Sequence, residues 1–229
     1  MSPRWLALAA AVALLGGGPG SAAALTLEAT ADTFVSDDSP MSNFGSFSFV
    51  EVGVIGLPKA AIVRGLLTFD LSAVPPGIGT ARLQFVLTDA VPDPPNLSVT
   101  VTRLATDFGE HTVTWDTQPA DLPAPSAIAV VTQPIGGVAT IDVTALVQAQ
   151  RLGAMPNTLS LRIAATDEMP GSFESHYFDF ATREADPPQA ARLLIDAAQG
   201  VPAVSGGAWL AALLGLTAVA AATLKRRHG

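Results

Sequence analysis

Apolar and polar residues alternate along the middle of this chain, and this pattern constrains the fold more than any other feature. Between residues 159 and 163, for example, Leu159, Leu161 and Ile163 alternate with Ser160 and Arg162. A period of two places alternate side chains on opposite faces of a strand, so such segments are half-buried antiparallel β-strands. Strands are predicted at 25–30, 47–52, 62–71, 82–88, 97–102, 127–131, 138–143, 159–163, 176–180 and 191–195.

Turn-forming clusters of Pro, Gly and Asn separate the predicted strands. These clusters lie at 74–77, 92–96, 134–137 and 186–188. The segment 142–151 differs, since its apolar residues at 143, 146 and 147 and the following Gly153 predict a short helix at one end of the fold. Nine or ten short strands with this spacing predict an all-β fold, a jelly-roll β-sandwich with one short helix.

The N-terminal end has the pattern of an export signal. Residues 1–24 contain one arginine, an apolar run from Trp5 to Leu15 and the small residues Ala22 to Ala24. This is typical of a secretory signal peptide, because the apolar run is too short to span a bilayer comfortably. We therefore expect an exported domain at 25–198.

The C-terminal end has the pattern of a membrane anchor. Residues 208–224 are 17 uncharged residues, which correspond to about 25 Å of helix. The basic segment 225–229 follows directly, and the positive-inside rule places it in the cytoplasm. We expect a linker at 199–207 and a transmembrane helix at 208–224, which first anchors the protein in the inner membrane.

Charge and cysteine content exclude several functions for the exported domain. From Leu25 to Val201, eight Lys and Arg stand against all 20 acidic residues, a formal charge of −12. Such a domain repels nucleic acid and anionic polysaccharide. The chain has no cysteine, so it has no disulfide, thiol nucleophile or cysteine metal site.

Several segments of the domain together point to a known family. They are Ala31–Val35, Asn43–Gly45, Phe49–Val52, Arg64–Ser72, Thr114–Pro119, Ile141–Thr144 and Phe180–Glu184. In this order, over residues 30–196, the chain resembles the DNRLRE domain family. The resemblance implies a jelly-roll sandwich on secreted and surface proteins, some of them assigned to carbohydrate-binding modules that recognise uronic-acid polymers. Phe108 departs from the family, which usually has Trp there.

The C-terminal tail resembles a second group of sequences. Val201–Pro202, Trp209, the apolar span and the final basic cluster are similar to PEP-CTERM sorting signals of bacteria. The resemblance implies that an exosortase-like transpeptidase processes the tail. Signal peptidase is the expected partner at the N-terminal end. It also implies that the protein reaches the outer cell surface or the extracellular space.

Aromatic residues are the first candidates for contact with a sugar. Trp115, Tyr177 and Phe44 are the candidate ligand-binding residues. Trp115 lies in the Thr-Trp-Asp-Thr-Gln-Pro segment, which resembles a stereotyped turn of the family, and we expect its ring to be buried or partly buried. Sugar stacking on Trp115 is the alternative. Phe44 and Phe47 can instead cover an edge of the sandwich.

Oxygen-bearing side chains cluster near the start of the domain. Asp32, Asp37, Asp38 and Asn43 are candidate ligands for a structural calcium ion, which needs six to eight oxygens. The alternative is a solvated acidic turn. No other cofactor is expected.

These patterns predict a non-catalytic surface protein that interacts with extracellular material, with polysaccharide as the candidate partner. A purely structural envelope or matrix protein is the alternative. A third hypothesis is a jelly-roll polysaccharide lyase, which needs a groove that brings Tyr177 or His176 together with an arginine. Nucleic acid is not expected as a partner.

Overall fold

The computed structural model describes residues 24–56, 60–75, 77–153, 155, 157–168, 174–185 and 189–197 of the 229. All of them belong to one compact unit, Met1–Ala198, and the second unit is Gln199–Gly229. The predicted signal peptide (apart from Ala24), linker, transmembrane helix and basic tail lie outside the described residues. Within the described part of the chain, no helix is long and apolar enough to cross a membrane.

Eleven β-strands and two short helices make up the described part of the chain. The strands are β1 (Leu25–Glu28), β2 (Ala31–Ser36), β3 (Phe49–Ile55), β4 (Ala61–Asp70), β5 (Ile78–Val91), β6 (Leu97–Leu104), β7 (Asp121–Val131), β8 (Val138–Asp142), β9 (Thr158–Ala165), β10 (His176–Ala181) and β11 (Arg192–Ala197). The helices are the 3-10 helix η1 (Trp115–Thr117) and the α-helix α1 (Thr144–Arg151). The predicted all-β architecture with one short α-helix is confirmed, with one strand more than expected.

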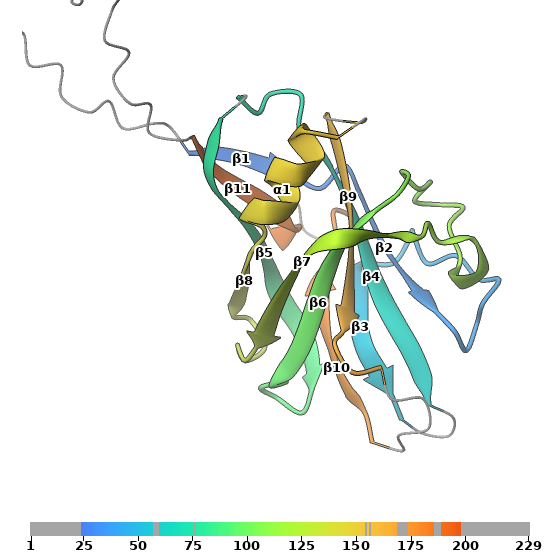
Figure 1. The fold of residues 1–229 in the computed structure, drawn as a ribbon. Helices are drawn as coiled ribbons and strands as arrows, with labels where there is room; N and C mark the ends of the chain where they lie inside the picture. The colour runs from blue at the N-terminus through green and yellow to red at the C-terminus, as the bar shows by residue number, and fades with distance from the viewer. Residues whose placement is uncertain are drawn as a thin grey trace, which may run out of the picture. The chain divides into compact units, whose positions relative to one another are not determined.

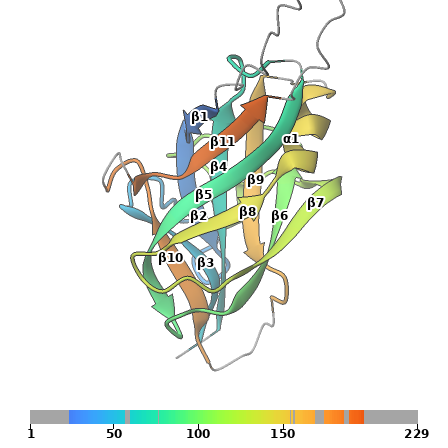
Figure 2. The ribbon, with the colours of Figure 1, turned by 90° about the vertical axis from the view of Figure 1, so that its left-hand side faces the viewer.

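The strands form one curled, antiparallel sheet that folds over on itself as a sandwich (Figures 1 and 2). Its order is β1-β11-β5-β10-β3-β4-β9-β6-β7, while β2 pairs with β4 and β8 with β5. The first part of β5 pairs with β11 and β8, and its last part, 87–91, pairs with β10. Because β5 passes from one layer to the other, the two layers enclose a single core.

Strand β2 was not among the strands predicted from alternation, which ended the first strand at Thr30. The chain changes partner at this point, since Ala29 N donates to Ala191 O while Thr30 N donates to Thr68 O. The first segment therefore pairs with β11 and the second with β4. Side chains of β2 from Asp32 onward are buried on both faces, so the strand shows no alternation in the sequence.

The core lies between the layers and is filled mainly by aliphatic residues and phenylalanines. Phe85, Phe178 and Phe180 are among its largest fully buried side chains. Helix α1 packs against β5 and β7 and adds Leu146 and Val147 to this core. The helix therefore covers apolar side chains that the strands alone would leave open.

A smaller apolar cluster lies outside this core. It consists of Val35, Leu66, Leu104 and Val113, with Phe108 and Trp115 packed against it. Residues 105–120, which connect β6 to β7, supply three of these side chains; we call this segment the 105–120 loop. The loop covers the outer face of β2 and β4, which explains why β2 is buried on both faces.

Candidate functional site

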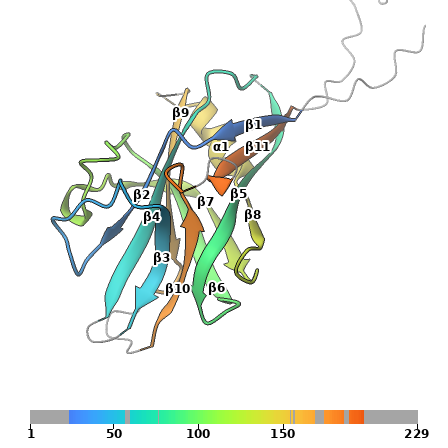
Figure 3. The same ribbon diagram turned by 180° about the vertical axis from the view of Figure 1, so that it is seen from behind.

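The strands β3, β10 and β5 are adjacent in the sheet (Figure 3). Their register brings three carboxylates into line across the outer face of the sandwich. Asp179 of β10 lies directly opposite Glu51 of β3 and directly opposite Asp89 of β5. Its neighbours Phe178 and Phe180 belong to the core, so alternation turns Asp179 outward. We call Glu51, Asp179 and Asp89 the acidic row.

The carboxylates of the acidic row repel one another, and like charges directly opposite in a sheet are destabilising. Burial, followed by the charges of Glu51 and Asp89, raises the pKa of Asp179 to about 8. Burial, followed by the charge of Asp89, raises the pKa of Glu51 to about 7. Oδ1 of Asp179 is buried and receives no hydrogen bond from the described residues. The row therefore holds a hydrogen-bond acceptor that the surrounding structure leaves unsatisfied.

An apolar row borders the acidic row on the same face. Tyr177 lies opposite Val91 of β5 and Gly53 of β3. Val91 is exposed, and the half-buried Tyr177 places its hydroxyl 3.4 Å from Oδ2 of Asp89. Gly53 has a φ of 138°, and a Cβ there would lie 2.2 Å from His176 O, so only glycine fits. Because Gly53 has no side chain, the ring of Tyr177 has no cross-strand side chain beside it on β3. The ring lies next to the carboxylates of the acidic row.

Trp115 is half-buried and packs against the small cluster under the 105–120 loop. The guanidinium carbon of Arg64 lies 4.2 Å from the centre of its ring, a cation–π contact. Nε and Nη2 of Arg64 donate to the two carboxylate oxygens of Glu168, at 2.7 and 2.6 Å. One face of Trp115 is therefore occupied by a side chain that is itself held in place, and the ring is not a free platform.

Phe44 belongs to a group of four phenylalanine rings. It stacks on Phe34, with ring centres 4.4 Å apart, and contacts Phe47 edge to face. Phe47 and Phe34 both contact Phe49, and Phe47 is 43% exposed. The rings pack on one another, which is the arrangement expected of side chains that cover an edge of the sandwich.

The four residues predicted to bind calcium do not converge on one point. Asp32 lies near the start of β2, whereas Asp37 and Asp38 follow its end, and five residues of extended strand span roughly 16 Å. Oδ1 of Asp37 accepts a hydrogen bond from the backbone N of Ile62 at 2.7 Å. The side-chain amide of Asn43 donates to two carbonyl oxygens of the 105–120 loop, at 2.8 and 2.7 Å. Asp37 and Asn43 thus bond to backbone groups.

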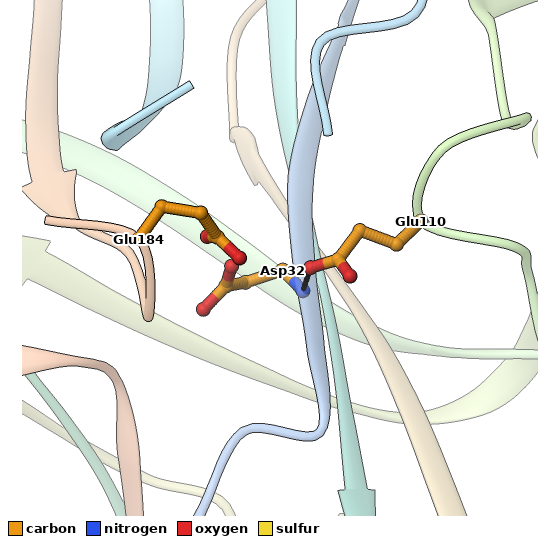
Figure 4. A group of neighbouring side chains, drawn as sticks. All are labelled: Asp32, Glu110 and Glu184. Carbon is orange, nitrogen blue, oxygen red and sulfur yellow. Dashed lines mark hydrogen bonds between the residues drawn. The ribbon is translucent and has the colours of Figure 1, made fainter. Parts of the chain in front are cut away.

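Asp32 instead meets two carboxylates from distant parts of the chain (Figure 4). One oxygen from each of Asp32, Glu110 and Glu184 lies within 4.8 Å of the others. Glu110 comes from the 105–120 loop, and Glu184 from the turn that follows β10. We call these three residues the Asp32 group. Sequence reasoning did not select Glu110 or Glu184, because the chain is rich in carboxylates and nothing in the spacing of these two marks them.

Hydrogen bonds tie the Asp32 group together around Arg183. Nη2 of Arg183 donates to Oε2 of Glu110 at 2.6 Å, and the backbone N of Arg183 donates to Oδ2 of Asp32 at 3.1 Å. The backbone N of Asp32 donates to Oε1 of Glu110 at 3.0 Å. Burial raises the pKa of Asp32 to about 7, against the opposing effect of the Arg183 N–H. The ion pair between Arg183 and Glu184, 3.6 Å long, belongs to the same arrangement.

Comparison with known proteins agrees with this architecture. No curated protein matches the sequence at a significant level. The sequence model of carbohydrate-binding module family 96 matches residues 23–196, from just before β1 to all but the last residue of β11. The match covers well over half of the chain and nearly the whole sandwich. The chain therefore belongs to carbohydrate-binding module family 96.

Proposed function

We propose that this protein is an exported, surface-anchored and non-catalytic module that binds a neutral polysaccharide across the acidic row and Tyr177. Membership of a carbohydrate-binding family supports binding as the activity. The observation that carries the choice of site is the alignment of three carboxyl groups, from β3, β10 and β5, beside a half-buried tyrosine ring.

The two rows match the two chemical faces of a sugar. A pyranose presents an apolar face of C–H groups, which packs on an aromatic ring such as Tyr177. Its hydroxyl groups donate and accept hydrogen bonds, and carboxyl groups accept such bonds when ionised and can also donate one when protonated. Glu51, Asp179 and Asp89 line up such groups across three strands. A sugar lying over Tyr177 would place its hydroxyl groups beside this line of carboxyl groups.

Charge favours a neutral ligand over the uronic-acid polymers that the DNRLRE resemblance implies. The exported domain carries a formal charge of −12. At the proposed site, the carboxylates of a polyuronate would face three carboxylates of the protein, and like charges repel. Arg64, which lies over the Trp115 ring, is already engaged by Glu168. Neutral glycans avoid this repulsion.

The sequence at both ends supports export and anchoring as part of this proposal. Residues 1–24 have the pattern of a signal peptide, and residues 208–229 resemble a PEP-CTERM tail. Signal peptidase and an exosortase-like transpeptidase are the processing partners that these patterns imply. The sandwich would then act at the outer cell surface or in the extracellular space.

The surroundings of Tyr177 oppose a lyase. Burial, followed by the charges of Asp89, Asp179 and Glu51, raises the pKa of its hydroxyl. A tyrosine that abstracts a proton needs the opposite shift, since the phenolate is the basic form. Among the described residues, the charged groups that act on Tyr177 are all acidic. A structural envelope protein stays as the second candidate, favoured by the packing of Trp115 beneath Arg64.

The proposed function is tested by replacing Tyr177 with alanine and measuring affinity for a panel of polysaccharides. We expect wild-type protein to bind at least one neutral glycan and no polyuronate. Loss of the ring should weaken that binding about three- to tenfold, the range of an aromatic contact. Glycan arrays identify the ligand, and affinity electrophoresis quantifies it.

Two matched variants control for indirect effects. Tyr177→Phe keeps the ring and should keep most of the affinity. His176→Ala alters the adjacent residue, which belongs to the opposite face of β10, and should bind like wild type. Binding to polyuronates alone, or unchanged affinity in Tyr177→Ala, would contradict the proposed site. Binding to no glycan would leave the structural candidate.

Replacement of Trp115 by alanine tests whether this ring stabilises the fold or binds the sugar. We expect it to destabilise the fold by about 1–2 kcal/mol, because a half-buried ring and its contact with Arg64 are lost. Neutral-glycan affinity should be nearly unchanged. Thermal unfolding and the glycan assay measure the two effects, and the reverse result, lost binding with unchanged stability, would make Trp115 the platform.

A further inference from the structure

The Asp32 group is a second unusual site, separate from the acidic row. Three carboxylates from β2, the 105–120 loop and the turn after β10 approach within 4.8 Å. Asp32 is only 1% exposed, and its Oδ1 receives no hydrogen bond from the described residues. In Figure 4 the carboxylates of Asp32 and Glu184 point toward each other. A buried, unsatisfied carboxylate oxygen aimed at a second carboxylate requires a positive partner.

Arg183 supplies part of that positive charge. Its guanidinium contacts Glu110 at 2.6 Å and Glu184 at 3.6 Å, while only its backbone N reaches Asp32. His111 Nε2, on an exposed side chain, lies 3.7 Å from Oε2 of Glu110. With His111 neutral, three ionised carboxylates and one guanidinium leave two negative charges. Oδ1 of Asp32 is the atom that Arg183 does not satisfy. A divalent cation has the charge that the group lacks.

We propose that Asp32, Glu110 and Glu184 bind one calcium ion. All three offer carboxylate oxygens, which hard cations prefer, and the group contains no nitrogen or sulfur ligand that would select zinc. Calcium–oxygen distances are about 2.3–2.6 Å, so two oxygens on one ion can be no more than about 5 Å apart. The 4.8 Å limit within the group meets this condition. Water and backbone carbonyl oxygens would complete the coordination.

The consequence is a cross-link between segments that are far apart in the sequence. Asp32 and Glu110 are 78 positions apart, and Arg183, next to Glu184, lies 73 positions beyond Glu110. A bound ion would hold the 105–120 loop, and with it Trp115, against β2. This inference is independent of the glycan proposal, since neither Tyr177 nor the acidic row takes part.

The test is calcium titration of the purified protein by calorimetry, together with thermal unfolding in calcium, magnesium and EDTA. We expect one calcium ion per chain. Calcium at about 100 times its Kd should raise the Tm by roughly 5–10 °C relative to EDTA. Magnesium should raise it less, because it demands a stricter octahedral geometry.

Two variants locate the ion, and one serves as control. Glu184→Gln, at a partly exposed position that should not affect folding, and Asp32→Asn should each weaken calcium binding about tenfold or more. Asp38→Asn, in the turn beyond the other end of β2, should bind calcium like wild type. Equal Tm in calcium and EDTA, or undiminished binding in both Glu184→Gln and Asp32→Asn, would overturn the proposal. Loss of calcium binding in Asp38→Asn alone would show that the ion binds in that turn.

Discussion

Replacement of Asp179 by asparagine is expected to stabilise the protein at pH 8 and to change its stability little at pH 4. The carboxylate of Asp179 is buried between Glu51 and Asp89, and its pKa is raised to about 8. Asparagine has a similar shape and no charge to bury. At pH 8 we expect a gain of roughly 2–4 kcal/mol, or about 5–10 °C in Tm.

The sign follows from proton linkage. In the unfolded chain Asp179 titrates near its ordinary pKa of 3.8, and in the folded protein near 8. Between these values the folded protein holds a proton that the unfolded chain has released. The stability that this proton confers is complete below about pH 4 and is lost as the pH rises toward 8. Glu51, with its pKa raised to about 7, acts in the same direction.

Thermal unfolding followed by circular dichroism between pH 4 and pH 9 measures the effect. Asp142→Asn is a matched control with the opposite sign. Hydrogen bonds from Thr144 lower the pKa of the Asp142 carboxyl. Asp142→Asn should therefore slightly destabilise the protein at pH 8. If Asp179→Asn melts at or below the wild-type temperature at pH 8, the charge of Asp179 does not destabilise the folded protein.

Above about pH 8, where Asp179 is ionised, the same substitution should weaken glycan binding, because an ionised acceptor is replaced by a neutral amide. A gain in stability together with a loss of affinity is typical of residues kept for function rather than for folding. A variant that is more stable and binds equally well would place the sugar away from the acidic row.

Replacement of Arg183 by alanine is expected to cost about 2–3 kcal/mol in EDTA. Its guanidinium pairs with Glu110, a carboxylate only 10% exposed, and lies near Glu184. Removal leaves three carboxylates within 4.8 Å of one another, with the exposed His111 imidazole, 3.7 Å from Oε2 of Glu110, beside them. Chemical denaturation in EDTA measures the loss, and added calcium should restore part of it if the Asp32 group binds the ion.

The control for this prediction is Arg82→Ala. Arg82 pairs with Asp196 at 2.8 Å, and the two side chains are 51% and 40% exposed. An exposed pair of this kind contributes about 0–1 kcal/mol, so the variant should unfold almost like wild type. If Arg183→Ala and Arg82→Ala lose the same free energy of unfolding, burial of the Glu110 carboxylate does not explain the loss in Arg183→Ala.

Much of the fold was predictable because the relevant information is local. Alternation in β6 marks a strand whose two faces differ in burial, and the apolar spacing after Asp142 marks α1. Strand β7 extends six residues before its predicted start because it is an edge strand, where Pro123 and Pro125 need no hydrogen-bonding N–H. Alternation did not reveal strand β2, because its residues from Asp32 onward are buried on both faces and do not alternate in polarity.

The candidate sites were less predictable, because they depend on which residues of distant strands lie opposite each other. Alternation shows that Glu51 and Asp179 face outward, but not that they are neighbours across β3 and β10. Trp115 was expected to be partly buried, whereas its contact with Arg64 depends on where the 105–120 loop lies on β4. Asp32 was a candidate ligand in the sequence, yet its carboxylate neighbours come from the loop and from the turn after β10.

The sequence by itself determined the strand-rich architecture, the short helix, the acidic charge and the likeness to carbohydrate-binding modules, since each follows from local periodicity, composition or motif order. Only the tertiary structure decided the acidic row, the covering of Trp115 and the meeting of the Asp32 group. The physical reason is that strand register and loop position are set by packing between segments far apart in the chain, and a period of two assigns a residue to a face without naming its neighbour.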